Sequence, residues 1–417
     1  MHAALRPRGA AGSGLLRLNA FGASWMGVLL MPVYIPFLHS RGLRTAEILD
    51  LQAIYSLAVM AFEIPTGLVC DLLGRRRTII LGACLNLAGL LGFAAAGRFA
   101  TYAAVQLVLA SGWSLVSGAD VAMIYDVLDR SGADRDARRH ALGTYTLAQV
   151  TGEAAAALAG GFVAACSLRA VGWLTAAEAV LPLALAFGLP EGARRREHAL
   201  ATVRAIPRAS RDVLGAALPR LLFANWVVWG LSTFIAVWLL QPFWQQQEVG
   251  LRWFGLLWAA TLLTVGVCSR LAPQLVRVAG PRASFLLLAI LPVLGYGGMA
   301  AFTGVPGIAA GFLFYASRGL NGVVLREAFN HHVPSALRAT FNSIGSGASR
   351  LGYAAAGPLI GLVIDHAGLR AALACLCATF LFLLVALGIP LARRLGSSPG
   401  PARAATPPGN DAAPGTR

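Results

Sequence analysis

The chain has 417 residues, of which 57% are hydrophobic and only 12% are charged, and its mean hydropathy is +0.67. A soluble globular protein carries about 25% charged residues, so this composition excludes a soluble multidomain enzyme. The net charge of +16 is also found in nucleic-acid-binding proteins, but all 34 basic residues are arginines that lie between long apolar runs. That placement indicates membrane topology and predicts no nucleic-acid partner.

The first segment, residues 1–14, is basic and rich in Gly and Ala, and no convincing cleavage site separates it from the apolar run that follows. We therefore expect this run to be the first membrane span and not a removed signal peptide. A helix needs about 20 apolar residues to cross a bilayer. By this measure twelve spans are predicted, near residues 15–38, 48–70, 78–97, 101–126, 140–165, 169–189, 219–242, 253–276, 283–303, 306–330, 338–364 and 369–392.

The twelve spans fall into two groups of six, which predicts an all-α polytopic membrane protein built from two pseudo-symmetric bundles. The bundles are residues 15–189 and 219–392, and residues 1–14 form a short cytoplasmic segment before them. A basic linker, residues 190–218, joins the bundles. The last segment, residues 393–417, is rich in Pro, Gly, Ala and Ser, so we expect a disordered cytoplasmic tail.

The arginines predict the orientation of these spans. If the N-terminus, alternate loops and the C-terminus share one side, that side has 24 arginines, while six lie on the other side and four lie in or beside spans. By the positive-inside rule, we expect both termini to be cytoplasmic. The membrane is expected to be a bacterial cytoplasmic (inner) membrane. The six are Arg41, Arg44, Arg98, Arg169, Arg252 and Arg370, and the four are Arg270, Arg318, Arg326 and Arg350.

A short pattern, G-x3-D-x2-G-x-R, occurs twice. Residues 67–76 (GLVCDLLGRR) end the second span, and residues 361–370 (GLVIDHAGLR) end the eleventh, on the opposite side of the membrane. A pair of small residues occurs in the fifth span, and a similar pair occurs in the eleventh. Spans 2, 5 and 11 therefore resemble one another at intervals that are multiples of three helices. Nested three-helix repeats inside two six-helix halves are the construction of one major class of secondary transporters.

The segment from Glu63 to Arg76 resembles the signature of the major facilitator superfamily between helices 2 and 3, and the resemblance covers essentially the whole chain. It implies a monomeric transporter that works by alternating access without a cofactor. Leu72 stands where the superfamily has a basic residue. We expect Asp71, Arg75 and Asp126 to form a latch that closes the cytoplasmic side, because Asp71 can face a helix N-terminus and arginines can bridge carboxylates. The alternative is that the arginines only set topology. The whole gate motif is Gly67, Asp71, Gly74, Arg75, Arg76 and Asp126.

The fifth span contains residues 152–161 (GEAAAALAGG), which are similar to the superfamily's antiporter signature G-x3-G-P-x2-G-G. Small residues at this spacing let helices pack closely in lipid. The resemblance implies proton-coupled efflux. Ala156-Ala157 replaces the Gly-Pro pair, so a facilitator or a proton symporter for uptake stays open. Two segments, at Arg318-Gly319 and from Arg338 to Thr340, are similar to the bacterial drug-efflux-like branch.

Ionisable residues at membrane depth cost about 2.5 kcal/mol or more each, so they indicate function. Three acids are candidates for proton coupling: Asp120, Glu153 and Glu178. Desolvation favours the neutral form of a carboxyl group, so such a residue can take up and release a proton. Arg318 and Arg350 are candidates for binding substrate or pairing with these acids. A static ion pair that only buries both charges is the alternative.

In the superfamily, helices 1, 4, 7 and 10 line the central cavity, which implies that Asp120 and Arg318 lie in it, with Glu153 and Arg350 at its side and Glu178 on a peripheral helix. Aromatic and amide side chains suit an amphiphilic small molecule. Trp and Tyr also belong to interfacial belts, which is the alternative for each of them. The candidates for this cavity are Asn19, Trp25, Tyr34, Trp113, Asn225, Trp226, Trp229, Arg318 and Arg350.

The more distant alternative is a polytopic membrane enzyme such as a prenyl or acyl transferase. That chemistry needs clustered aspartates or a His-centred base, and Asp126 and Asp129 form no D-x3-D pair. The chain has no lysine and hence no P-loop for ATP-driven pumping. His331-His332 has no acidic cluster beside it, so no metal site is predicted. The expected partners are a small-molecule substrate, a proton and membrane lipid.

Overall fold

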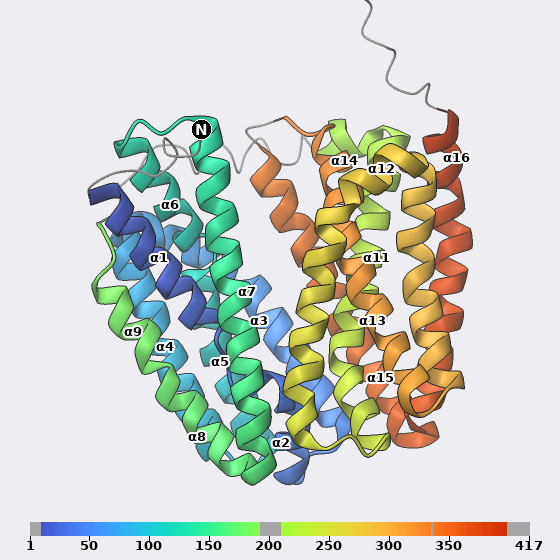
Figure 1. The fold of residues 1–417 in the computed structure, drawn as a ribbon, viewed down its shortest axis with the longest axis horizontal. Helices are drawn as coiled ribbons and strands as arrows, with labels where there is room; N and C mark the ends of the chain where they lie inside the picture. Colours follow the sequence, from blue (N-terminus) through green and yellow to red (C-terminus); the bar gives the residue numbers. More distant parts are fainter. Residues whose placement is uncertain (1–9, 192–209, 335–336, 398–417) are drawn as a thin grey trace, which may run out of the picture.

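The computed structural model describes residues 10–191, 210–334 and 337–397, and every regular element within them is helical (Figure 1). Ten helical segments are long and apolar enough to cross a membrane. Two of them, Leu251–Ala301 and Thr340–Gly396, contain a break at Gly280 and at Gly368, so the described chain has twelve crossing segments. The predicted all-α class is confirmed. The predicted N-terminal segment, linker and tail lie largely outside the described residues.

The N-terminal half lies on the left of Figure 1, in blue to green. Its first span is broken into α1 and α2, its fourth into α5 and α6, and its sixth into α8 and α9. The elements are α1 (Ala10–Met26), η1 (Met31–Val33), α2 (Tyr34–Ser40), α3 (Thr45–Leu73), α4 (Arg75–Ala95), α5 (Phe99–Val116), α6 (Ala119–Arg130), α7 (Arg135–Cys166), α8 (Leu168–Glu178) and α9 (Val180–Phe187).

The C-terminal half lies on the right of Figure 1, and both ends of the described chain point to the upper side. Its tenth span is interrupted by a π-helical turn, η2, at a place that corresponds to the α5–α6 break in the fourth. The elements are α11 (Ala217–Gln246), α12 (Leu251–Ala301), α13 (Gly304–Asn321), η2 (Gly322–Arg326), α14 (Glu327–Asn330), α15 (Arg338–Leu383), η4 (Leu384–Gly388) and α16 (Ile389–Ser397).

Three pairs of successive helices turn at a glycine with positive φ. The φ angles are 84° at Gly74, 80° at Gly280 and 83° at Gly368, a region that L side chains rarely adopt. In each case an arginine follows two positions later. The G-x-R part of the repeated pattern thus occurs a third time, between the eighth and ninth spans, where the sequence analysis did not find it.

Helix α7 uses the small residues of its 152–161 segment on two faces. A Cβ added to Gly152 or Gly160 would overlap the backbone carbonyl of Ala23 or Leu29 in the first span. On the other face, a Cβ on Gly255 of α12 would overlap the carbonyl of Ala157. Small residues therefore allow backbone-to-backbone packing both inside the N-terminal half and between the two halves.

A buried amide joins the halves at what we name the closed end, defined by the loop from Ser40 to Thr45 together with Gln245 and Asp365. Gln241 of α11 donates from Nε2 to the carbonyl of Met31 at 2.8 Å, and its Oε1 accepts from the amide of Ile35 at 2.9 Å. In an unbroken α-helix, Ile35 would donate to Met31 itself. Gln241 therefore occupies a gap in the first span and satisfies both backbone groups.

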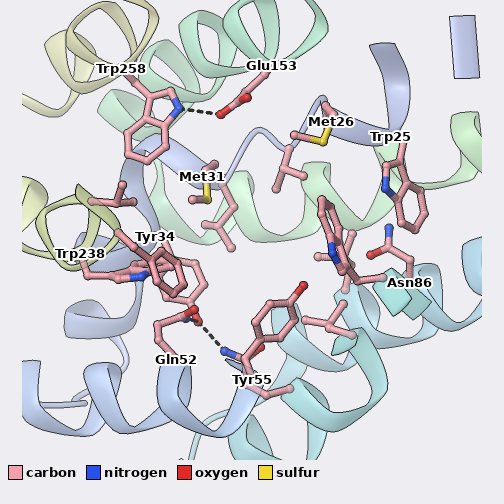
Figure 2. A pocket seen from close by; sticks show the side chains of 18 of the residues that line it. Trp25, Met26, Met31, Tyr34, Gln52, Tyr55, Asn86, Glu153, Trp238 and Trp258 are labelled. Atoms are coloured by element: carbon pink, nitrogen blue, oxygen red, sulfur yellow. Dashed lines mark hydrogen bonds between the residues drawn. The ribbon is translucent and has the colours of Figure 1, made fainter. Parts of the chain in front are cut away.

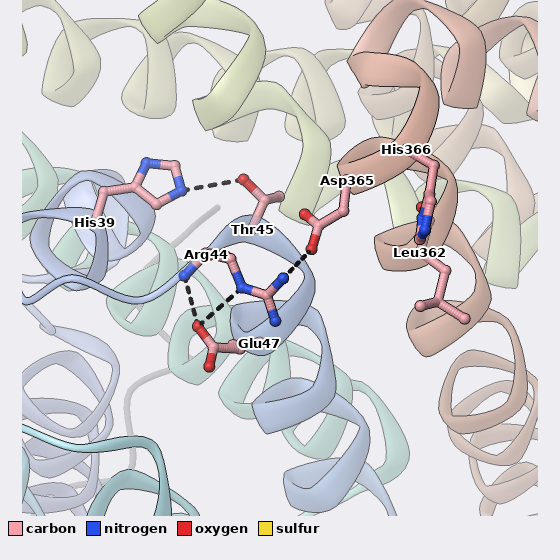
Figure 3. A network of polar contacts seen from close by, with 7 residues as sticks. All are labelled: His39, Arg44, Thr45, Glu47, Leu362, Asp365 and His366. Atoms are coloured by element: carbon pink, nitrogen blue, oxygen red, sulfur yellow. Dashed lines mark hydrogen bonds and ion pairs between the residues drawn. The ribbon is translucent and has the colours of Figure 1, made fainter.

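Further polar contacts lie at the closed end, and Figure 3 shows several of them. Arg44 pairs with Asp365, the aspartate of the second G-x3-D-x2-G-x-R copy, at 2.9 Å across the halves. His39 bonds to Gln245 at 3.0 Å and to Thr45 at 3.1 Å. Beside them, a Cβ on Gly361 would lie only 3.0 Å from that of Ala46, so the backbones of α3 and α15 also meet here.

Contact between the halves ends part of the way along the spans. Ala157 of α7 and Gly255 of α12 lie on the faces where the two halves touch. By helical spacing, Gly143 and Gly266 lie on the same faces of these helices, yet a Cβ on either would meet nothing within 4 Å. We name this side, which carries Gly143 and Gly266, the open end. The halves are thus packed together at one end and separated at the other.

The backbone contact of Gly160 predicts a position-specific cost. Gly160→Ala must move α7 away from the first span, and overpacking of this kind costs about 1–3 kcal/mol. Gly143→Ala, the same change on the same helix in open space, should be neutral or raise stability by up to about 1 kcal/mol through helix propensity. The measurement is the thermal midpoint of the purified variants in detergent. Equal midpoints for the two variants would contradict the packing described here.

We expect the two bonds of the Gln241 amide to hold the closed end shut. With the six native cysteines replaced by alanine, Ala46→Cys and Gly361→Cys should form a disulfide on oxidation, because their Cβ atoms lie near bonding range. Adding Gln241→Leu should slow this cross-link several-fold, since both bonds to the first span are lost. Gln245→Leu, which loses only the His39 contact, should slow it less. An unchanged rate with Gln241→Leu would count against the role of the amide.

Candidate functional site

A cavity of about 390 Å³ lies between the halves, beginning where the closed end stops. Its walls come from both bundles, and Figure 2 shows them from close by. The volume is within the range of about 300–1,000 Å³ that is usual for small-molecule sites. Since the cavity lies between the packed and the separated parts of the two halves, a bound molecule would touch both.

Aromatic side chains form a large part of the cavity wall. Trp25 and Trp113 stack with ring centroids 6.3 Å apart on the N-terminal side. Tyr34 meets the edge of Trp238 from the other half at 5.5 Å. Aromatic rings offer large rigid surfaces for an apolar body. Trp238, Trp258, Tyr55 and Tyr315 also line the cavity, and the sequence analysis did not single them out.

A buried polar cluster lies beside these rings. The hydroxyl oxygen of Tyr34 accepts bonds from Gln52 at 2.7 Å and from Gln106 at 3.0 Å. Asn86 adds another amide to the lining. The sequence analysis missed all three amides. Amide side chains inside apolar spans are costly to bury without partners, so this was a signal in the sequence that could have found them.

The cavity lining contains one carboxylate and two guanidinium groups. Glu153 of α7 accepts a 3.1 Å bond from the indole Nε1 of Trp258, which spans the two halves (Figure 2). Arg318 of α13 lies close enough for its charge to act on Glu153. Arg350 of α15 faces Tyr55 and, beyond the lining, Glu63 of α3. The structure thus brings Glu153, Arg318 and Arg350 together, with Trp25 and Trp113.

Other predicted cavity residues lie outside the cavity lining. Asn225 is fully buried and donates to the carbonyls of Leu221 and Leu387, and it accepts a 3.0 Å bond from Trp229. These two side chains join α11 to the last span within the C-terminal half. Asn19 is half-buried on α1 and is not among the lining residues. For Asn225 and Trp229 the reason is rotational: α11 turns this face toward the last span and a different face toward the cavity.

Asp120 also lies outside the cavity lining, in a local structural setting. It is the second residue of α6, just after the break at Gly118, and its Oδ1 accepts from the amide of Val121 at 2.7 Å. Its Oδ2 accepts a 2.6 Å bond from the hydroxyl of Tyr145, so the carboxylate is only 7% exposed. A helix N-terminus and a hydroxyl together stabilise the charge.

Glu178 ends α8 and faces the break in the first span. A Cβ on Gly27 would lie 3.6 Å from its Oε1. Glu178 is half-buried and is not among the lining residues of the cavity. It therefore lies behind the first span, as expected for a residue of the peripheral sixth span.

The predicted gate motif lies at the open end. Arg75 pairs with Asp126 at 2.5 Å, with both side chains largely buried, and also donates to the carbonyl of Ala122. Arg76 donates to the carbonyl of Phe187 and reaches the exposed Glu191 at 3.8 Å. All of these contacts lie inside the N-terminal half. Gly67 has open space around it, and within the described chain Asp71 makes no hydrogen bond or ion pair.

The chain matches the family model of the Major Facilitator Superfamily over residues 16–325. No match was found among curated protein sequences. Several solved structures share the fold at low sequence identity. The nucleoside transporter NupG has a TM-score of 0.76 and 12% identity, with 92% of this chain and 99% of that chain covered.

Two further structures are similar over most of their length. A mutant of the peptide transporter POT has a TM-score of 0.71 and 16% identity, covering 94% of this chain and 98% of its own. The inward-open xylose transporter XylE from E. coli has a TM-score of 0.64 and 14% identity, covering 89% and 95%. At these identities the likeness shows the fold alone.

The Arg75–Asp126 pair predicts a large and reversible effect on stability. Arg75→Gln takes the cation away from a largely buried carboxylate, which costs about 3–5 kcal/mol. Adding Asp126→Asn removes the charge and should recover part of that loss. Arg76→Gln, next in sequence with an exposed ionic partner, should cost much less, because exposed pairs contribute about 0–1 kcal/mol. Thermal midpoints of the four proteins test this. A loss in Arg75→Gln no larger than in Arg76→Gln would refute it.

Proposed function

The chain belongs to the major facilitator superfamily and is a multi-pass membrane transporter, not an enzyme, and from this premise we propose that it exports an amphiphilic small molecule by alternating access in exchange for protons. The observation that carries the proposal is Glu153. It is the one carboxylate among the cavity-lining residues, and it bonds to Trp258 where the contact between the halves ends. A proton taken up there would change both the charge of the cavity and a bond between the halves.

The two copies of G-x3-D-x2-G-x-R support the alternation. Asp365 of the second copy is engaged with Arg44 at the closed end, whereas Asp71 of the first copy lies at the end where the halves are separated. The proposal is that Asp71 engages the opposite half when that end closes, with the Arg75–Asp126 pair holding the motif in position. On the predicted orientation, the open end faces the cytoplasm of a bacterium and the closed end faces outward.

Glu153 is the best placed of the three candidate proton carriers. Asp120 is held by Tyr145 and the start of α6, and Glu178 lies behind the first span. Glu153 alone faces the cavity and touches the other half. An inward proton gains about 2.3 kcal/mol per 100 mV of membrane potential, which is enough to drive modest efflux.

Uptake with a proton is the second candidate. The α7 segment favours an antiporter through its likeness to the superfamily signature, but Ala156-Ala157 departs from that signature. The excess of positive charge in the cavity lining favours symport, because a protonated Glu153 leaves both arginines available to a substrate. A facilitator without proton movement is the simplest alternative.

The test is flux into liposomes that contain the purified protein and an internal pH dye. Lipophilic cations, organic anions, antibiotics and sugars are added outside in turn. A substrate that enters by exchange should make the interior alkaline, and one that enters with a proton should acidify it. Either signal should disappear in Glu153→Gln and persist in Asp120→Asn and Glu178→Gln, the matched carboxylate controls.

Two results would decide against the proposal. Movement of a labelled compound without any pH change would leave a facilitator. A pH change that survives Glu153→Gln would remove Glu153 from the coupling step and return the role to another carboxylate.

A further inference from the structure

Two guanidinium groups in the cavity have no counter-ion in contact. Arg318 and Arg350 lie near the middle of the tenth and eleventh spans and both line the cavity. Neither forms a hydrogen bond or ion pair with any described residue, and Nε of Arg350 is buried without an acceptor. Arg318 is exposed although it lies at mid-span, so its exposed surface is turned toward the cavity.

The nearby carboxylates do not neutralise these arginines. Glu153 acts on Arg318 through its charge but is bonded to Trp258, and Glu63 acts on Arg350 from outside the lining. An unpaired guanidinium at membrane depth is expensive, and its planar set of donors matches a carboxylate, sulfonate or phosphate group. Arg75, by contrast, is paired with Asp126.

The other residues of the cavity wall indicate that the rest of the ligand is apolar or aromatic. Trp25 and Trp113 stack in the N-terminal half, and Tyr34 and Trp238 meet edge to face across the halves. Apolar and aromatic side chains dominate the lining, and the volume of about 390 Å³ suits a compact molecule. Such walls bind an apolar or aromatic body, while a few polar groups fix its orientation.

We propose that the substrate is an amphiphilic organic anion whose acidic head group binds Arg318 and Arg350 and whose apolar body lies against the tryptophans. This inference rests on one part of the proposed function, the cavity as the transport site, and it favours the symport candidate over exchange. The proposed function leaves the charge of the amphiphilic substrate open, and this inference makes that charge negative.

The same geometry connects the anion to the proton. Glu153 is faced by Trp258 from α12 and by Arg318 and Tyr315 from α13. When Glu153 is neutral, Arg318 has no competing negative charge beside it, so a bound anion and a proton on Glu153 stabilise each other. An anionic substrate therefore travels in the same direction as the proton, which is the symport alternative.

The test is equilibrium binding to the protein in lipid nanodiscs, so that it does not depend on transport. The probes share one ring system and differ in charge: 2-naphthalenesulfonate, 2-naphthylmethanol and 2-naphthylmethylammonium. A second set has an octyl chain with sulfate, hydroxyl and ammonium heads. The sulfonate or the sulfate should bind at least about tenfold more tightly than its neutral and cationic partners, as expected for charge-assisted bonds to arginine.

Variants of single residues test whether the two arginines cause the preference for the anion. Arg318→Gln and Arg350→Gln should each reduce the preference for the anion, and the double variant should abolish it. Arg326→Gln, on the same span as Arg318 but outside the lining, should keep it. Glu153→Gln should bind the anion more tightly than the parent, whereas a purely structural role for Glu153 would weaken binding.

The inference is overturned if neither anion binds more tightly than its neutral and cationic partners, or if the preference survives in the Arg318→Gln/Arg350→Gln protein. Its failure is distinguishable from that of the proposed function. Anion binding without proton movement in liposomes would defeat proton coupling alone, and proton-coupled movement of a cation would defeat the anion alone.

Discussion

The conformation described here depends on the amide of Gln241 within the first span. Met31 and Ile35 are the acceptor and donor of one α-helical bond, and the side chain of Gln241 bridges the two groups instead. Pro32 and Pro36 beside them have no backbone N–H, so this stretch of helix also lacks two other bonds of its own. In lipid a broken backbone needs internal partners. Because the partner comes from the opposite half, the break in the first span and the closure of this end depend on the same side chain.

Close backbone packing sets where that closure stops. Lipid chains are as apolar as leucine, so helices associate through packing and polar contacts and not through the hydrophobic effect. Gly152 and Gly160 hold α7 against the first span, while Ala157 and Gly255 bring the halves into contact. Farther toward the open end, a Cβ on Gly143 of α7 or Gly266 of α12 would meet nothing within 4 Å, and the cavity begins where the contact between the halves ends.

The charges of the chain separate into three settings that match three roles. The Arg75–Asp126 pair lies inside one half and holds its motif together. The Arg44–Asp365 pair joins the halves at the closed end, where the groups are accessible to water and can separate at low cost. Arg318 and Arg350 have no ionic partner among the described residues and lie in the cavity. A charge without an ionic partner at mid-span is costly, so these two arginines indicate a binding site for an anionic ligand.

Hydropathy along the chain was enough to predict the membrane spans, and the motif from Glu63 to Arg76 was enough to predict the superfamily, because both are properties of consecutive residues. The cavity was predictable only in part. Trp25, Trp113, Glu153, Arg318 and Arg350 line it, but Asn225 and Trp229, four residues apart on one helix face, are turned toward the last span. Which way a face points depends on the rotation of each helix about its axis and on breaks, such as the one at Gly118 that directs Asp120 to Tyr145. Rotation is set by packing against distant segments, so only the tertiary structure could decide it.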